Sequence, residues 1–192
     1  LAHIYLSGDD DEGLMIGNYI GDSVKGRRLS DYPFSIQCGI LLHREIDSFT
    51  DSHPVYRQSK DRFVPVAGRY AGVVWDVVYD HFLAKNWGGY HSLPLKKYAW
   101  RAYGRILKNW FRLPGEMQRF SVNFISKQRL TAYATIDGIR DTLDLMSNGT
   151  SLPNCSDEVV NVMIRDYYDL ENEFLQFFFE IRRHIDDFKM NF

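Results

Sequence analysis

Hydrophobic residues recur every three to four positions along most of this chain, which is the spacing of one face of an α-helix. Alternating patterns of the kind that predict strands are scarce, and glycine or proline separates many of the helical segments. The pattern therefore predicts an all-α, compact multi-helix globule that forms one domain over residues 1–192. We expect seven or eight helices in the ranges 14–24, 33–53, 56–63, 68–87, 95–111, 117–129, 135–147 and 157–189.

Three signals mark helix starts. The acidic run at residues 9–12 suits the positive N-terminal end of the first helix. Pro33 is placed to open the second helix, and Asp157 is expected as the N-cap or a first-turn acid of the last.

Composition narrows the class of protein. The net charge of −2 argues against nucleic-acid binding driven by bulk electrostatics. The two cysteines, Cys38 and Cys155, lie far apart and form no disulfide framework, which favours a reducing compartment. No apolar run approaches the length of a membrane span, and the start as given shows no signal peptide. We therefore expect a soluble cytoplasmic protein without a membrane partner.

The segment at residues 43–53 concentrates two imidazoles and three carboxylates within a predicted helix. His43 and Asp47 are four residues apart and share a helix face, and Asp51 follows one turn later. Such a face can bind a divalent cation that accepts both nitrogen and oxygen ligands. The alternative is a solvated acidic face with no ligand.

A second polar segment, residues 17–26, places Asn18 and Asp22 on one helix face, with Lys25 a turn further on. Two glycines inside this helix weaken it, so the close approach of another helix or a ligand would explain them. The alternative is glycines used only for packing, with Asp22 at a solvated edge.

The third segment, residues 75–83, places Asp76 and Asp80 on one face among valines and a phenylalanine, while His81 projects about 100° away. A carboxylate buried in such surroundings needs a partner or a metal ion. The alternative is a simple ion pair with one of three basic residues, Arg44, Arg69 or Lys85.

Taken together, the three segments suggest a metal-assisted phosphohydrolase site of the histidine–aspartate kind. His3 could join the site if the first helix packs against the other three. Basic residues in or near the same segments could hold phosphate oxygens: Lys25, Arg27, Arg28, Arg44, Arg57, Lys60 and Arg62. The aromatic run at residues 174–181 is expected to pack in the core or to form a hydrophobic groove for a ligand or a partner helix.

The chain also resembles the acyl carrier protein phosphodiesterases, or acyl carrier protein hydrolases. Four blocks carry the resemblance, strongest in the first half of the chain: Leu1-Ala2-His3-Ile4-Tyr5-Leu6-Ser7, Gly17-Asn18-x-x-Gly21-Asp22-x-Val24-Lys25-Gly26, Gly39-Ile40-x-x-His43-Arg44-x-Ile46-Asp47-x-Phe49-Thr50-Asp51-x-His53-Pro54 and Asp76-x-x-x-Asp80-His81-Phe82-Leu83. The resemblance implies an all-α fold related to histidine–aspartate domain phosphohydrolases. It also implies a divalent cation, Mn²⁺, and removal of 4′-phosphopantetheine from holo-acyl carrier protein.

Two features depart from the family pattern. Asp80-His81 reverses the usual order of the histidine–aspartate dyad. Members of the family usually begin Met-Asn-Phe-Leu-Ala-His, whereas this chain begins Leu1-Ala2-His3 and ends Met190-Asn191-Phe192. Joining the end to the start would restore that opening, so we expect a circular permutation or a re-ordered terminus.

On this basis we expect four metal ligands, Asp22, His43, Asp47 and Asp80, with Asp51 and Asp76 as substitutes. The expected catalytic residues are His81 or His53 as the general acid, together with Asp76 and Arg44. Lys25 and Arg44 are expected to bind the phosphoryl oxygens. Two alternatives stay open: a phosphohydrolase acting on a nucleotide or another small phosphodiester, and a catalytically silent helical binding module.

Overall fold

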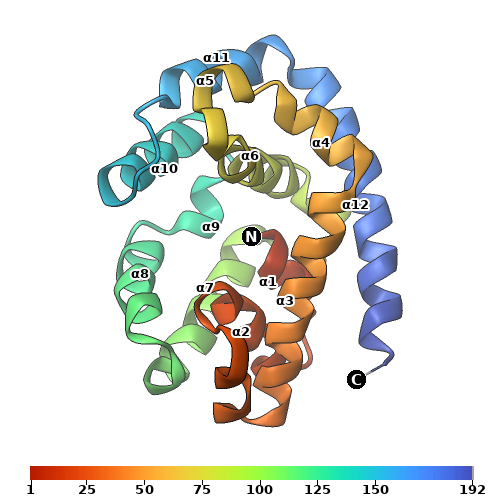
Figure 1. Cartoon of the computed structure of the whole chain (residues 1–192), viewed down its shortest axis with the longest axis vertical. Coiled ribbons are helices and arrows are strands. Elements are labelled where there is room, and N and C mark those ends of the chain that lie inside the picture. Colours follow the sequence, from red (N-terminus) through yellow and green to blue (C-terminus); the bar gives the residue numbers. More distant parts are fainter. Residues whose placement is uncertain (192) are drawn as a thin grey trace.

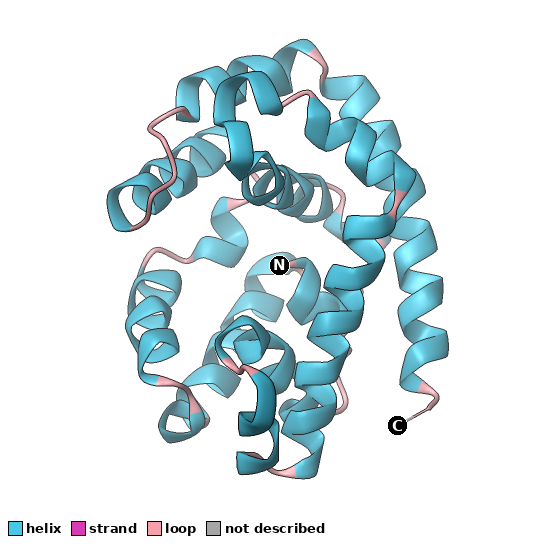
Figure 2. Cartoon of the chain, viewed as in Figure 1, coloured by secondary structure: helices cyan, strands magenta, loops and turns pink. Residues whose placement is uncertain are grey.

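The computed structural model describes residues 1–191, and within that range the ordered elements are all helical (Figure 2). The all-α prediction is therefore confirmed. None of the helices in the described range is both long enough and apolar enough to span a bilayer. The predicted junction between the two ends of the chain involves Phe192, which lies outside the described residues.

The described residues form twelve α-helices: α1 (Ala2–Leu6), α2 (Glu12–Ile20), α3 (Phe34–Ser52), α4 (Pro54–Asp61), α5 (Val64–Ala67), α6 (Ala71–Lys85), α7 (Leu95–Lys108), α8 (Gly115–Ser126), α9 (Arg129–Ala132), α10 (Ile136–Gly149), α11 (Ser156–Arg165) and α12 (Tyr167–Lys189). A short 3₁₀ turn, η1 (Gly21–Ser23), extends α2. Pro33 precedes α3 as expected, and the Asp11 side chain caps α2 by accepting from the Leu14 N–H (3.0 Å).

The prediction of one long helix over residues 157–189 is wrong, because the chain breaks at Asp166 into α11 and α12. The two halves pack on different neighbours: α11 lies against α5 and α10, while α12 lies against α3, α4 and α6. Tertiary packing therefore turns the chain at a point where the helical pattern continues. Asp157 stands in the first turn of α11, and Cys155 occupies the N-cap.

Helices α2 and α3 lie side by side at close range (Figure 1), and glycine makes this possible. A Cβ added at Gly17 would lie 2.1 Å from the carbonyl oxygen of Ile36, and one at Gly39 would lie 2.2 Å from that of Leu14. Helix packing therefore accounts for Gly17. It also brings Asn18 of α2 next to His43 of α3.

Three aromatic side chains of α12, Phe174, Phe177 and Phe178, pack in the core. Phe174 stacks on Phe82 and Phe178, and Phe177 stacks on Tyr79. The expectation that the run at residues 174–181 packs in the core is confirmed for these three rings, whereas Leu175 and Phe179 of the same run are exposed. Because α12 runs along α3, α4 and α6, these rings also form part of the wall of the cavity described next.

Candidate metal centre and active-site cavity

A cavity of about 560 Å³ lies where the three polar segments meet. Its wall includes five carboxylates and two imidazoles: Asp22, Asp47, Asp51, Asp76, Asp80, His3 and His43. The sequence predicts all five of these acids as ligands or substitutes, and the fold brings them to one cavity. The site therefore combines α1, η1, α3 and α6, which are far apart in the sequence.

Asn18 fixes the orientation of both imidazoles. Its fully buried Nδ2 donates to the His3 carbonyl oxygen (2.8 Å) and to Ser7 Oγ (2.9 Å), which leaves Oδ1 as an acceptor. The 2.9 Å contact between Oδ1 and His3 Nδ1 therefore requires that nitrogen to donate. His43 Nδ1 donates to the Asn18 carbonyl oxygen at 2.8 Å. Both rings are thus held with Nε2 free to face other ligands.

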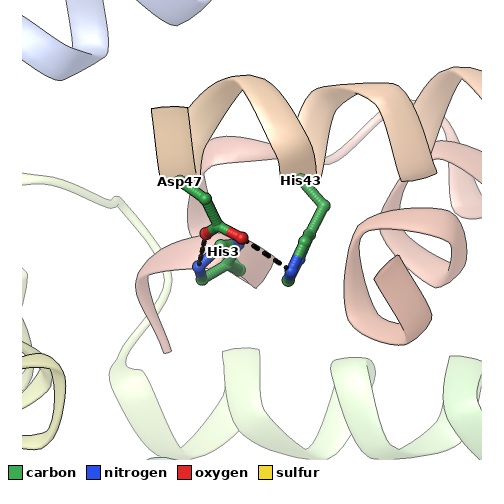
Figure 3. Close-up of side chains that lie close together, drawn as sticks. All are labelled: His3, His43 and Asp47. Atoms are coloured by element: carbon green, nitrogen blue, oxygen red, sulfur yellow. Dashed lines mark ion pairs between the residues drawn. The ribbon is translucent and has the colours of Figure 1, made fainter. Parts of the chain in front are cut away.

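The two Nε2 atoms converge on Asp47 (Figure 3). His3 Nε2 lies 3.5 Å from Asp47 Oδ1, and His43 Nε2 lies 3.2 Å from Asp47 Oδ2. His43 Nε2 is also 3.2 Å from Asp22 Oδ1, which belongs to η1. Gly21 makes room for this ring, since a Cβ there would lie 2.3 Å from His43 Cγ.

The donor set fits a divalent cation. The ligand atoms of His3, His43 and Asp47 lie within 4.8 Å of one another, so the trio could hold a metal ion. Buried His43 Nε2 makes no hydrogen bond of acceptable geometry to any described residue, although it has two carboxylate oxygens nearby. Two imidazole nitrogens and a carboxylate suit a transition-metal ion such as Mn²⁺ or Zn²⁺. Asp22 contacts one member of the trio and stands at its edge.

Electrostatics support the same conclusion. Burial opposes a charge on His43, but the close contacts with the negatively charged Asp22 and Asp47 raise its pKa to about 10. Without a metal ion the ring therefore holds a proton at neutral pH, and a divalent cation would compete with that proton. The pKa of His3 is lowered by burial and by the charge of His43. A proton on His43 is thus favoured, while a second proton on His3 is opposed.

Asp76 has a different environment from the proposed ligands. It accepts a hydrogen bond from the Tyr56 hydroxyl (2.8 Å) and lines the cavity, where it is accessible to solvent yet surrounded by protein. Burial, reinforced by the negative charges of Asp80 and Asp47, raises its pKa to about 7 despite the Tyr56 bond. A carboxyl with this pKa can carry a proton at neutral pH.

Asp80 binds the beginning of the chain. Its carboxylate accepts from the Leu1 amino group (2.5 Å) and from the Ala2 N–H (2.9 Å), which ties α1 to α6. The alternative in which Asp76 or Asp80 pairs with Arg44, Arg69 or Lys85 is wrong. Asp76 instead accepts from Tyr56, and Asp80 accepts from Leu1 and Ala2.

Four predicted residues do not line the cavity. His53 Nε2 contacts Glu180 Oε2 (3.1 Å), and its ring packs against Phe49 and Phe177. His81 donates through Nδ1 to the Tyr133 carbonyl oxygen (2.9 Å) and contacts the Tyr167 hydroxyl through Nε2 (2.8 Å). Both imidazoles therefore make their contacts outside the cavity, away from its five aspartates.

The other two are the basic residues expected to contact phosphate. The exposed Arg44 donates to the Val24 carbonyl oxygen (2.9 Å), so it braces the turn after α2. Exposed Lys25 lies near enough to Asp22 to contribute to the lowering of the Asp22 pKa, for which the largest cause is the close contact with His43. Neither reaches the cavity wall.

Sequence reasoning left His3 conditional and missed Arg129 and Tyr133. His3 joins the site because α1 packs on α2 and α6. Arg129 and Tyr133 are buried and line the cavity, although Arg129 falls at the end of a predicted amphipathic helix. A single basic residue at a helix end gives no signal of burial, so the pattern alone could not identify it.

Comparison with known proteins gives a consistent result. Residues 1–181 match the family model described as "Acyl carrier protein phosphodiesterase", so the similarity extends through the second half of the chain. A protein of that name from Yersinia pestis is 30% identical over 179 residues, which is 93% of this chain and 92% of the relative. One from Serratia proteamaculans (strain 568) is 30% identical over 189 residues, 97% of each chain. No solved structure gives a significant match.

Proposed function

This chain belongs to the acyl carrier protein phosphodiesterase family, and we propose that it hydrolyses the phosphodiester between 4′-phosphopantetheine and a serine of holo-acyl carrier protein. The products are the apo carrier protein and free 4′-phosphopantetheine. The observation that carries the proposal is the meeting, in one cavity, of a trio able to hold a metal ion and a carboxyl whose pKa is about 7.

In this proposal His3, His43 and Asp47 hold the divalent cation, with Asp22 beside them. The cation, which we propose is Mn²⁺, would acidify a water molecule and withdraw charge from a phosphoryl oxygen. Asp80 positions His3 by holding the start of α1, since its Oδ2 accepts from Leu1 and its Oδ1 accepts from Ala2. Asn18 sets the tautomer of His3 and the orientation of both rings.

Asp76 is the proposed general acid. As the oxygen of a water molecule, which loses a proton to solvent, bonds to phosphorus, the bond from phosphorus to the serine oxygen breaks, and protonated Asp76 gives its proton to the serine oxygen. Tyr56 holds the Asp76 carboxyl in place through its hydroxyl. His53 and His81 suit this step less well, because their nitrogens face Glu180, Tyr133 and Tyr167.

The apolar part of the wall would receive the pantetheine arm. Its side chains come from α6, α8 and α10: Val73, Val77, Phe120, Phe124 and Met146. Val73 and Phe120 are exposed and would form the entrance. A cavity of about 560 Å³ lies within the range of pockets that enclose small ligands.

Two further parts of the proposal have indirect support. A relation to histidine–aspartate domain phosphohydrolases is supported by the meeting of His43 and Asp47 from one helix with His3 from another. A cytoplasmic location is supported by Cys38 and Cys155, which are both buried and unpaired.

The test is incubation of the purified protein with holo-acyl carrier protein and Mn²⁺, followed by mass spectrometry of the carrier. We expect conversion to the apo form with release of 4′-phosphopantetheine. His43→Ala should abolish it, while the control His184→Ala, which changes an imidazole paired with Glu45 away from the cavity, should not.

Three outcomes would contradict the proposal. Cleavage of small phosphodiesters without cleavage of the carrier would favour the small-substrate alternative. A folded protein that binds no Mn²⁺ and hydrolyses nothing would favour the silent binding module. Equal activity in the wild type and His43→Ala would exclude the trio as the catalytic centre.

A further inference from the structure

We propose that Arg129 and Tyr133 form a binding site for the phosphoryl oxygens of the substrate, on the wall of the cavity contributed by α9 and the residue that follows it. The identity of the substrate rests on the proposed function. The site itself rests on the surroundings of these two side chains.

Arg129 is a buried cation that has no partner among the described residues. Only 9% of the residue is exposed, and it lines the cavity. Within residues 1–191 the guanidinium makes no side-chain hydrogen bond and no ion pair. Arg62 and Arg101, by contrast, pair with the carboxylates of Glu173 and Asp9. An unpaired buried charge is costly, so an anion entering the cavity would complete the site.

Tyr133 supplies a second donor beside it. It lies four residues after Arg129 across one helical turn, is 9% exposed and lines the same cavity. Within the described part of the chain its hydroxyl has no hydrogen-bond partner. Burial, with the charge of Asp80, raises the pKa of Tyr133, and Arg129 opposes this rise. The hydroxyl therefore stays protonated and can donate.

The backbone around the two residues is fixed. His81 donates to the carbonyl oxygen of Tyr133 (2.9 Å), and the Leu130 N–H donates to the Tyr103 hydroxyl (2.9 Å). These bonds hold both ends of α9 to α6 and α7. His81 is therefore a positioning residue for this wall. The Arg129 and Tyr133 donors are preorganised before any ligand enters.

Charge distribution explains why such a site is needed. Five aspartates line the cavity, and those that are ionised would repel the anionic phosphodiester even with one cation bound. Among the described residues of the wall, Arg129 is the one arginine or lysine. A guanidinium can donate two parallel hydrogen bonds to two oxygens of a phosphoryl group, and a phenol can add a third. This pair thus occupies the role expected of Arg44 and Lys25.

The test compares two ligands that differ only in the phosphoryl group. Calorimetry with Mn²⁺ present gives the affinity of each variant for 4′-phosphopantetheine and for pantetheine. We expect Arg129→Met to reduce the preference for the phosphorylated ligand about 10–100-fold, and Tyr133→Phe about 3–10-fold. Arg129→Lys, which keeps the charge but loses the two-point contact, should fall between the wild type and Arg129→Met.

Arg140→Met is the matched control, because Arg140 pairs with Asp137 and Asp157 outside the cavity. It should leave the preference unchanged. An unchanged preference in a folded Arg129→Met would overturn the inference. If Arg129→Met fails to fold by circular dichroism, unchanged preferences in both Arg129→Lys and Tyr133→Phe overturn it.

The assay separates this inference from the proposed function. Binding of the two ligands is measured without turnover, so a preference that depends on Arg129 can exist in a protein that does not cleave holo-acyl carrier protein. That result would keep the phosphoryl site and reject the proposed reaction. If the protein cleaves holo-acyl carrier protein but its preference for the phosphorylated ligand does not depend on Arg129, the proposed reaction is kept and the phosphoryl site is rejected.

Discussion

Two buried histidines, His43 on α3 and His81 on α6, make the same type of hydrogen bond through Nδ1 but have different partners at Nε2. Each donates through Nδ1 to a backbone carbonyl oxygen, that of Asn18 at 2.8 Å and that of Tyr133 at 2.9 Å. They differ at Nε2. His43 presents it to the carboxylates of Asp22 and Asp47, whereas His81 presents it to the hydroxyl of Tyr167.

The consequence is visible in their protonation. Burial acts on both rings, but the two carboxylates raise the pKa of His43 to about 10, while burial leaves the pKa of His81 below its ordinary value. Residue type and proximity in a motif therefore say little about which imidazole binds a cation. The group that faces the second ring nitrogen decides it.

The largest expected difference between the two regions is in activity. His43→Ala should remove a proposed ligand and lower kcat/KM for holo-acyl carrier protein by about 10³-fold or more, a loss of roughly 4 kcal/mol of transition-state stabilisation. His81→Ala should reduce activity far less and should mainly lower the melting temperature. Steady-state kinetics with calorimetric unfolding of both variants checks this. Equal activity losses in two folded variants would erase the distinction.

Asp76 gives the next largest effect. Asp76→Asn keeps the shape and the contact with Tyr56 but cannot give a proton, so kcat should fall about 10²–10³-fold. Activity that needs the protonated acid should decline in the wild type as pH rises through about 7, and this decline should be absent from the variant. A pH–rate profile measures it, and an unchanged alkaline limb in Asp76→Asn would assign the proton to another group.

Asn18 should matter through the metal ion rather than through the reaction itself. Asn18→Ala removes the acceptor that orients His3, and we expect Mn²⁺ affinity to fall about 10–100-fold. Asn86→Ala is the control, because Asn86 donates to Glu171 and to the Phe82 carbonyl oxygen outside the cavity. Metal titration of both variants tests this, and matching affinities would show that His3 is oriented by other contacts.

The smallest expected effect is a pH dependence of stability at His81. Its folded-state pKa is depressed, so below the unfolded value of about 6.5 the unfolded chain binds the extra proton more readily than the folded one. Stability from this group is thus present above pH 6.5 and is lost as pH falls below it. The melting temperature of wild type relative to His81→Gln should drop by about 2–4 °C between pH 7.5 and 5, for a change of about 1 kcal/mol. A difference that does not vary with pH would contradict it.

The sequence predicts the α1–α6 side of the cavity better than the α9 side, and the reason is physical. Asp22, His43, Asp47, Asp76 and Asp80 stand at helical spacings within apolar segments, so their shared faces can be read from the pattern. The direction in which His53 and His81 point depends on Glu180 and Tyr167, which are more than 80 residues away. Such contacts leave no local signal.

The α9 side of the cavity is harder to predict from the sequence, because it too depends on contacts between distant segments. Arg129 and Tyr133 become site residues because α9 packs against α7, α8 and α10. In the sequence, Arg129 stands at the end of one predicted helix and Tyr133 in the gap before the next. The split between α11 and α12 was missed likewise, since the helical pattern runs through Asp166. Short helices and changes of direction follow from tertiary packing, which periodicity does not encode.

The most direct test of the central claim is an anomalous diffraction map of crystals grown with Mn²⁺. The account predicts one strong peak within bonding distance of His3 Nε2, His43 Nε2 and an Asp47 carboxylate oxygen, with the His43 ring still donating to the Asn18 carbonyl oxygen. A peak that excludes His43, or one coordinated by His81 or His53, would contradict it.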